Sequence, residues 1–293
     1  MKIRFGVGLG AEVAPAQFAD IVDRLETSGV DSLWLSELVY SQAIDPFVGM
    51  TYALARTARL KVGTSVAVLP GRHPVLVAKQ LASLAALAPK RVLPVFGLQP
   101  AIPAERDAFV VPKGERGAVF DESLRLLRTA LDNTGETFDG DYFHARDIDV
   151  LPKSAARVDI WLGGQSPAGF RRIGTYADGW LGSFVTPDEA RAARLTIAEA
   201  ADAAGREVPD DHYGISLAVG DGELPQAVVA AIRKRRPDLD PHELVASSWT
   251  QLHRQIDEYV AAGLSKFVIR PAGDISIDDF LDSFVTELLP REN

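Results

Sequence analysis

The amino-acid sequence predicts an α/β protein in which 293 residues form one (β/α)8 TIM barrel with small insertions. Short apolar runs of strand length alternate with longer helical patterns along nearly the whole chain. The apolar runs are almost continuous, as in parallel strands that helices cover. Eight strand–helix pairs can be counted, which favours a closed barrel over the alternative, an open doubly wound sheet. We therefore expect a single domain over residues 1–293.

The first half of the chain supplies four of these pairs. Pro15 opens the first helical pattern and Gly29 closes it, while Asp45 is a plausible N-cap before Pro46. Pro94 lies inside the fourth apolar run and is a defect for a central strand. The expected strands are 3–9, 31–35, 60–69 and 90–98, and the expected helices are 15–29, 45–58, 73–89 and 115–133.

The second half supplies the other four pairs and two segments outside the repeat. Residues 135–152 show turn residues and short alternation, which predicts a small excursion on the surface. Residues 220–247 are helical in part, and their basic run Arg233–Pro237 is typical of a solvated helix end. The expected strands are 158–164, 178–184, 212–219 and 265–271, and the expected helices are 167–177, 186–205, 249–263 and 276–290.

Composition narrows the classes of function. The net charge is −9, which argues against nucleic acid or an anionic membrane as the main partner but leaves a small-molecule substrate open. The chain has no cysteine, so disulfides, thiolate metal sites and cysteine nucleophiles are excluded. The amino-terminal residues do not resemble a signal peptide, and no run of about 18 uncharged apolar residues is present. These features predict a cytoplasmic protein.

In a barrel of this kind the chemistry lies at the carboxyl ends of the strands. The side chains expected there are mostly small or polar, and none form a His/Asp/Glu cluster with metal-ligand spacing. A nucleophile elbow and a P-loop are also absent from the sequence, so hydrolase functions are poorly supported. The residues expected at these ends are Gly8, Gly10, Glu37, Ser65, Val66, Gly97, Gln99, Gly163, Gly164, Gln165, Ser166, Ser183 and Arg270.

The stretch "WLGGQSPAGF" beginning at Trp161 is the most informative of these ends. A strand that stops on Gly163 and Gly164 and is followed at once by a helix from Pro167 presents free backbone N–H groups at a helix N-terminus. Glycine allows an oxyanion to approach the backbone without a Cβ in the way. The stretch therefore predicts a phosphate site, although a plain strand–helix turn would also use glycine.

Six segments are distinctive when taken together: "FGVGL", "GVDSLWLSE", "KVGTSVAVLPGRHPVLVAKQLASLAAL", "ERGAVFDESLRLLR", "WLGGQSPAGFRRIGTYADGWLGS" and "AAGLSKFVIRP". Together they resemble the luciferase-like oxidoreductase family, in its deazaflavin-dependent actinobacterial branch. They span most of the chain in order. The resemblance implies an eight-fold barrel, a flavin-type cofactor and hydride transfer.

The resemblance also implies roles for individual residues. It places a non-prolyl cis peptide at Ser65–Val66, as a support for the bent cofactor ring, and cofactor contacts on the loop after the fifth strand. Arg270 ends the eighth strand, where barrels often bind phosphate, and it is expected either to hold an acidic cofactor tail or to form a wall ion pair. The predicted cofactor-binding residues are Ser65, Val66, Gly97, Gly163, Gly164, Gln165, Ser166 and Arg270.

This sequence departs from the family at two positions that carry proton-transfer groups there. Leu38 stands where related enzymes have histidine after the second strand, and Gln99-Pro100 stands where they have Gly-Glu after the fourth. Glu37 is the acid that strand position places at the barrel mouth, so it is the candidate catalytic residue. A salt bridge from Glu37 to a nearby arginine, or a helix cap, is an equal alternative, and water is the simpler proton donor.

The leading functional hypothesis is an oxidoreductase that transfers hydride between coenzyme F420 and a small organic substrate. The alternatives are an FMN-dependent monooxygenase of the same fold and a cofactor-binding protein with little catalysis. The resemblance also implies a homodimer, formed through helices such as Pro74–Ala88.

Four further residues are weighed as site or wall residues. Glu105 is expected to brace the loop after the fourth strand, and His73 is expected to cap a helix or line the wall. Arg171 and Arg172 follow the predicted phosphate loop, so one of them could face a ligand.

Overall fold

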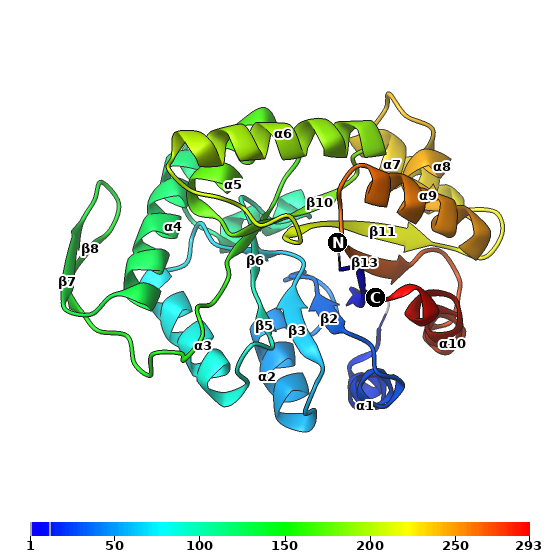
Figure 1. The fold of residues 1–293 in the computed structure, drawn as a ribbon, viewed down its shortest axis with the longest axis horizontal. Helices are drawn as coiled ribbons and strands as arrows, with labels where there is room; N and C mark the ends of the chain where they lie inside the picture. Colours follow the sequence, from blue (N-terminus) through cyan, green and yellow to red (C-terminus); the bar gives the residue numbers. More distant parts are fainter. Residues whose placement is uncertain (1, 12) are drawn as a thin grey trace. The chain divides into compact units, whose positions relative to one another are not determined.

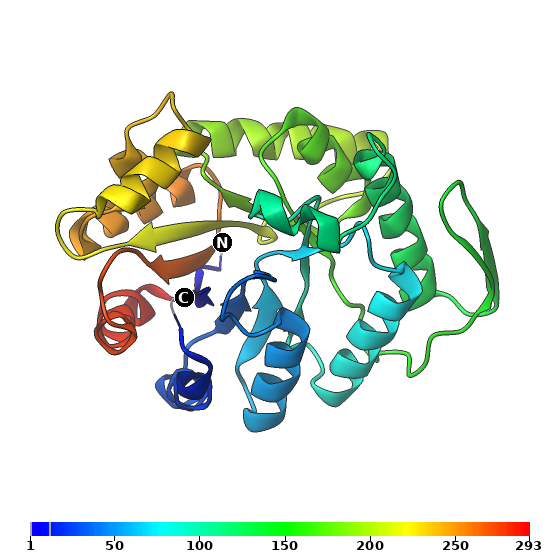
Figure 2. The same ribbon diagram turned by 180° about the vertical axis from the view of Figure 1, so that it is seen from behind.

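The computed structural model describes residues 2–11 and 13–293 (Figures 1 and 2). The chain divides into two compact units. Unit 1 consists of Met1–Leu9, Thr27–Trp34 and Gly164–Asn293, and unit 2 consists of Gly10–Glu26 and Leu35–Gly163. The chain passes between the units four times, at residues 9/10, 26/27, 34/35 and 163/164. Because neither unit is a continuous segment, we propose that residues 1–293 form one domain.

Unit 1 is built on parallel strands in the order β10-β11-β13-β1-β2. The pairs β10–β11, β11–β13 and β1–β13 are parallel, and Lys266 of β13 lies in register with both Arg4 and Gly214. A short strand, β12, pairs with the end of β11. The strands are β1 (Arg4–Leu9), β2 (Ser32–Leu35), β10 (Gly179–Ser183), β11 (Tyr213–Val219), β12 (Val245–Ala246) and β13 (Lys266–Pro271). The last residue of β2, Leu35, belongs to unit 2.

The helices of unit 1 begin at well-formed caps. Thr186 forms a reciprocal capping box with Glu189, and Ser248 and Ser276 each accept a backbone N–H at the start of their helices. A small hydrophobic cluster that includes Leu224 and Ile232 holds the segment between β11 and α9 in place. The helices are α5 (Pro167–Tyr176), α6 (Pro187–Ala203), α7 (Gln226–Arg235), α8 (Pro241–Leu244), α9 (Trp249–Ala261), α10 (Ile277–Leu288) and the 3₁₀ turn η3 (Leu289–Arg291).

Unit 2 contains the parallel pairs β3–β5, β4–β6 and β6–β9, and a separate antiparallel hairpin, β7–β8. The strands are β3 (Lys61–Thr64), β4 (Ala67–Val68), β5 (Val92–Leu93), β6 (Val95–Gly97), β7 (Glu136–Asp139), β8 (His144–Ile148) and β9 (Trp161–Gly163). The helices are η1 (Pro15–Gln17), α2 (Pro46–Arg56), α3 (Pro74–Leu87), η2 (Pro103–Ala108) and α4 (Arg116–Asp132), while α1 (Phe18–Ser28) begins in unit 2 and ends in unit 1.

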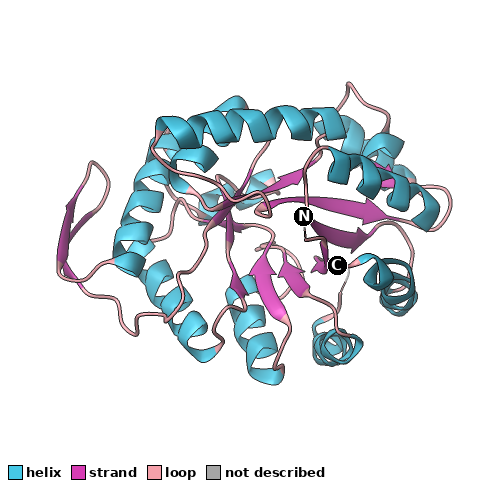
Figure 3. Cartoon of the chain, viewed as in Figure 1, coloured by secondary structure: helices cyan, strands magenta, loops and turns pink. Residues whose placement is uncertain are grey.

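Strands and helices alternate as the sequence predicts, and each of the eight expected strand positions holds a strand (Figure 3). Two of the expected strands are divided. Residues 60–69 form β3 and β4, separated at Ser65–Val66, and residues 90–98 form β5 and β6, separated at Pro94, which has no N–H for the ladder. The predicted N-cap at Asp45 is confirmed, since its carboxylate accepts the Val48 N–H at 3.0 Å. The predicted excursion at 135–152 contains the β7–β8 hairpin.

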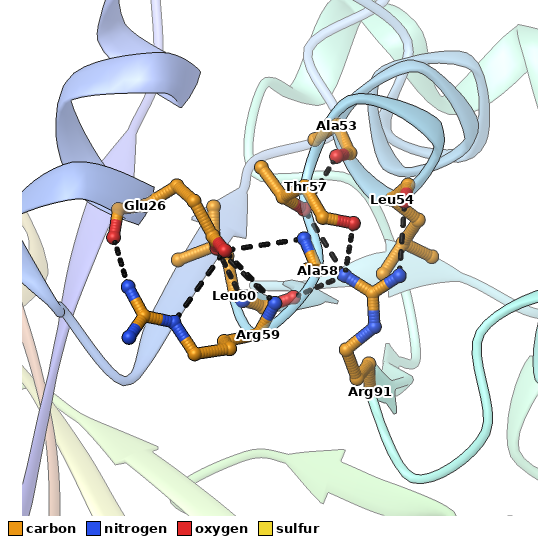
Figure 4. A network of polar contacts seen from close by, with 8 residues as sticks. All are labelled: Glu26, Ala53, Leu54, Thr57, Ala58, Arg59, Leu60 and Arg91. Carbon is orange, nitrogen blue, oxygen red and sulfur yellow. Dashed lines mark hydrogen bonds and ion pairs between the residues drawn. The ribbon is translucent and has the colours of Figure 1, made fainter.

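A polar network fixes the turn between α2 and β3 (Figure 4). The Glu26 carboxylate accepts backbone N–H bonds from Ala58, Arg59 and Leu60 at 2.8–3.2 Å. The Arg91 guanidinium donates to the carbonyls of Leu54, Thr57 and Leu60 and to the Thr57 hydroxyl. The network lies at the amino ends of β3 and β5, so its role is to stabilise the fold rather than to bind at the strand carboxyl ends. Among the described residues, no helix is long and apolar enough to cross a membrane.

Candidate functional site

Glu37 follows β2 in unit 2 and is a buried, fully paired carboxylate. Its side chain is 3% exposed. Oε2 accepts hydrogen bonds from the Val68 N–H at 2.7 Å and from Arg72 Nη1 at 3.0 Å. Oε1 accepts a hydrogen bond from Arg72 Nη2 at 2.5 Å. Both carboxylate oxygens are therefore engaged by a bidentate guanidinium and a backbone donor. This arrangement is the salt bridge that the sequence left open as the alternative to catalysis. The catalytic role of Glu37 stays a prediction.

Arg72 was not singled out from the sequence, although it organises this part of the site. Its guanidinium carbon lies 5.8 Å from the centre of the Phe47 ring and 5.0 Å from that of Phe109. The preceding residue, Gly71, has φ = +100°, and a Cβ there would meet the Phe109 backbone at 2.8 Å. Glycine thus lets the turn after β4 pack directly against the end of η2. The loops after β2, β4 and β6 are held together through Arg72.

Glu105 ties the same loops at a second point. It is fully buried in η2, and Oε1 accepts the backbone N–H of Tyr40 at 2.8 Å. The predicted bracing role is therefore confirmed. Its second oxygen, Oε2, is buried and has no hydrogen-bond partner among the described residues. A buried carboxylate with one unsatisfied oxygen is costly, and such groups in native proteins often mark functional sites.

The predicted ring support also lies in unit 2. The Ser65–Val66 peptide bond is cis, as the resemblance implies. Ser65 N–H donates to the Leu35 carbonyl at 2.7 Å, which fixes this bulge against the end of β2. A Cβ on Gly97 would lie 2.6 Å from the Val66 side chain, so glycine at the end of β6 leaves room for Val66. Ser65, Val66 and Gly97 thus form one packed group at the strand ends.

The predicted phosphate loop joins β9 to α5, with Gly163 in unit 2 and the following residues in unit 1. Gly164 has φ = +134°, a conformation that favours glycine, and a Cβ there would have no atom within 4 Å. Ser166 is the N-cap of α5 and accepts the Gly169 N–H at 3.1 Å. The Trp180 indole N–H donates to the Gly164 carbonyl at 2.9 Å and anchors the loop to β10.

The electrostatics of this loop suit an anion. Gly164, Gln165 and Ser166 are exposed, and the first turn of α5 contains no acidic residue. The dipole of α5 favours negative charge at this end, and the backbone N–H groups of Gly164, Gln165 and Ser166 directly precede the helix. Of the two arginines on α5, Arg171 is exposed and Arg172 is partly buried.

Arg270 lies near the end of β13 in unit 1, and its side chain contacts the neighbouring strands β11 and β1. Nε donates to the Ser216 hydroxyl at 3.1 Å and Nη1 donates to the Leu9 carbonyl at 3.2 Å. A Cβ on Gly8 would come within 2.7 Å of the arginine side chain, so Gly8 makes room for it. These contacts hold a guanidinium at the carboxyl end of β13, the end at which barrels bind their ligands.

Two other features of the molecule lie outside the predicted site. His73 occupies the N-cap of α3 without a side-chain cap bond, and its ring packs edge-on against Phe143 at 5.6 Å, a wall role as predicted. A cavity of about 300 Å³ in unit 1 is lined by α6 and the start of β11, including Arg194 and Tyr213, and contains none of the predicted site residues. No group of three or more His, Asp or Glu side chains in the described part of the chain could hold a metal ion.

Known proteins resemble this chain over most or all of its length. The F420-dependent glucose-6-phosphate dehydrogenase of Kineococcus radiotolerans is 24% identical, and the alignment covers 98% of this chain and 96% of that protein. The structure of an F420-dependent secondary alcohol dehydrogenase with an F420–acetone adduct has a TM-score of 0.82 at 20% identity and covers 100% of both chains. The structure of monooxygenase RslO1 from Streptomyces bottropensis has a TM-score of 0.81 at 18% identity and covers 99% of both chains.

These similarities confirm the predicted fold class, the luciferase-like TIM barrel. Residues 1–266 match the family model described as luciferase-like monooxygenase, which is most of the chain. The resemblance drawn from the strand ends is confirmed in the same way. The chain belongs to the luciferase-like monooxygenase family.

Proposed function

We propose that this chain is an F420-dependent oxidoreductase that transfers hydride between the deazaflavin and a small organic substrate. The observation that carries the proposal is the exposed Gly164–Ser166 loop at the N-terminus of α5, in a chain whose full-length relative from Kineococcus radiotolerans is named as F420-dependent. The residues fit a phosphate-bearing cofactor, because Gly164 leaves its Cβ direction open and the loop carries no acid.

The bound deazaflavin would supply and accept the hydride at its ring carbon. In unit 1, the backbone N–H groups of Gly164, Gln165 and Ser166 are proposed to bind the cofactor phosphate, and Arg270 to add positive charge. In unit 2, Ser65, Val66 and Gly97 are proposed to contact the ring, next to Gly163. The protein would thus act mainly by binding, orienting and shielding the cofactor.

Hydride transfer to or from an oxygen-bearing carbon also requires a proton to move. Leu38 and Pro100 cannot carry one. Both carboxylate oxygens of Glu37 are hydrogen-bonded to Arg72 or to the Val68 N–H. This supports a bracing role for Glu37 and water as the proton carrier. A positioned acid typically contributes about 10²–10⁴-fold in rate, so an enzyme that relies on water would be slower by a factor of that order.

An FMN-dependent monooxygenase is the second candidate function, and the structural likeness to monooxygenase RslO1 favours it. A backbone-lined phosphate loop serves FMN as well as a deazaflavin. The two functions differ in their use of oxygen.

The deciding experiment offers the purified protein reduced F420 with a panel of aldehydes, ketones and enones, and separately reduced FMN in an oxygen electrode. Substrate-dependent oxidation of reduced F420 without oxygen uptake is the expected result. Oxygen uptake that requires FMN and an organic substrate would favour the monooxygenase. Cofactor binding without turnover on any substrate would instead support a cofactor-binding protein.

We also propose a homodimer formed through α3. Leu76 and Leu87 on this helix are 67% and 80% exposed, and Val48 on α2 is 63% exposed, so apolar surface is available there. Light scattering at micromolar concentration tests this, and a monomer would contradict it.

A further inference from the structure

We propose that the basic end of α7, formed by Arg233, Lys234 and Arg235, binds the acidic tail of the deazaflavin cofactor and selects it over FMN. This inference rests on the proposed function. F420 continues beyond its phosphate into a chain of glutamyl carboxylates, whereas FMN ends at the phosphate. A protein that distinguishes them by charge needs cations beyond the phosphate loop. The α7 end supplies such a group.

The position of α7 is fixed by contacts with Phe184, the residue after β10. Arg236, at the C-cap of α7, donates to the Phe184 carbonyl at 2.6 Å. The Arg235 guanidinium carbon lies 4.7 Å from the centre of the Phe184 ring. Phe184 has φ = +55°, a conformation that is uncommon for an aromatic residue. The basic end of α7 therefore sits at the carboxyl end of β10.

The same strand connects this point to the phosphate loop. Trp180, near the start of β10, donates to the Gly164 carbonyl at 2.9 Å. Phe184 follows Trp180 by four residues, which corresponds to roughly 13 Å of extended strand. The phosphate loop and Arg235 are thus both anchored to β10, so an anionic chain that extends beyond a phosphate at Gly164–Ser166 has a cationic group along the same strand.

The charges of the cluster are available for a ligand. The Arg236 side chain is only 12% exposed and forms ion pairs with Glu189 and Asp238 at 2.7 Å each. These two acids are therefore paired with Arg236 and not with Arg233 or Lys234. Burial opposes ionisation of Glu189, but its bonds to Arg236 and to Thr186 outweigh burial and lower its pKa. Arg233 and Lys234 are exposed and have no acidic partner among the described residues.

A cation cluster without acidic partners is unexpected on a chain with a net charge of −9. The basic run was expected to be a solvated helix end; Arg233, Lys234 and Arg235 are exposed as expected, whereas Arg236 is largely buried. Solvation alone gives no reason for its fixed position at the carboxyl end of β10, the strand to which Trp180 also anchors the predicted phosphate loop. Local positive charge at a site can recruit an anionic ligand even when the whole protein is acidic.

The test compares binding of F420 with one glutamate, F420 with five or more glutamates, and FMN, each titrated by fluorescence at low and high salt. The variant is Arg233→Gln/Lys234→Gln, which leaves the Arg235 and Arg236 contacts intact. The control is Arg191→Gln/Arg254→Gln, which removes two exposed cations from α6 and α9 of the same unit. Both double variants change the net charge equally.

The long-tailed cofactor should bind the parent protein more tightly than the short-tailed one, and this advantage should weaken with salt. In the Arg233/Lys234 variant, the long-tailed form should bind roughly 3- to 30-fold more weakly, with the short-tailed form nearly unchanged. Equal affinity for both tail lengths, or equal losses in the variant and the control, would overturn the tail site while leaving F420 as the cofactor. Failure of both F420 forms to bind would contradict the proposed function itself.

Discussion

The two units use the carboxyl ends of their strands in opposite ways. In unit 2 the ends are braced by charged side chains, since Glu37 is paired with Arg72 and Glu105 holds the Tyr40 N–H. In unit 1 the ends present exposed backbone at Gly164 and a cationic side chain at Arg270. The difference separates two tasks: the braced loops fix the shape of a wall, while the open backbone is suited to bind an anion.

The largest effect is expected at Gly164. Gly164→Leu places a branched side chain where φ is +134°, so it strains the loop and fills the space beside the backbone. We expect cofactor binding to be lost in a fluorescence titration. Gly205→Leu is the matched control, because Gly205 also has positive φ and a Cβ there would have no atom within 4 Å, but it follows α6. Unchanged affinity in Gly164→Leu would remove the loop from the site.

The Glu37–Arg72 pair should matter next, and mainly for stability. Arg72→Ala leaves a buried carboxylate with only the Val68 N–H, so the free energy of unfolding should fall by roughly 3 kcal/mol in urea denaturation. Glu37→Gln weakens the same pair, so it should also act mainly on stability and keep measurable turnover. If Glu37→Gln retained cofactor affinity but lost turnover by about three orders of magnitude, Glu37 would be the proton donor.

Glu105 provides the corresponding test at the second brace. Glu105→Gln keeps an oxygen for the Tyr40 N–H, so we expect the free energy of unfolding to change by about 1 kcal/mol or less. Glu105→Ala removes that acceptor and should cost roughly 1–3 kcal/mol. A large loss of turnover in Glu105→Gln, without loss of stability or cofactor affinity, would show that the unpartnered oxygen takes part in the reaction rather than in bracing.

The smallest effect concerns two carboxylates outside the site. Burial opposes ionisation of Glu26 and Glu122, but three backbone N–H donors and a nearby arginine outweigh it for each, so both pKa values are lowered below 4.5. A lowered folded pKa gives stability that is present above the unfolded value and is lost as pH falls through the folded one. The double variant Glu26→Gln/Glu122→Gln should therefore lose less stability than the parent between pH 6 and pH 3. Parallel pH profiles would contradict these shifts.

The fold was largely predictable because its signals are local. Each of the eight apolar runs of strand length, and each helical pattern that follows, can be recognised within its own short segment of the sequence. The same holds for the N-cap at Asp45. Pro94 gave a local warning of the break between β5 and β6. The cis peptide at Ser65–Val66 came from the resemblance, since no single-sequence pattern specifies it.

The pairing of the site residues was less predictable because it is set by distant contacts. Glu37 and Arg72 are 35 residues apart, and Tyr40 and Glu105 are 65 apart. Strand position correctly predicted that Glu37 and Glu105 lie in loops that follow strands. It could not predict which arginine or backbone N–H each carboxylate binds. The position of Arg72, directly after a strand end in "PGRHP", was the available signal.

The central claim is that the chain binds a deazaflavin through the backbone of the loop after β9. The most direct test titrates the parent protein and Gly164→Leu with F420 and with FMN under identical conditions. Saturable binding of F420 to the parent, weaker binding of FMN and no binding of F420 to Gly164→Leu is the predicted result. Absence of F420 binding to the parent at high micromolar concentration, or equal binding to both proteins, would contradict the account.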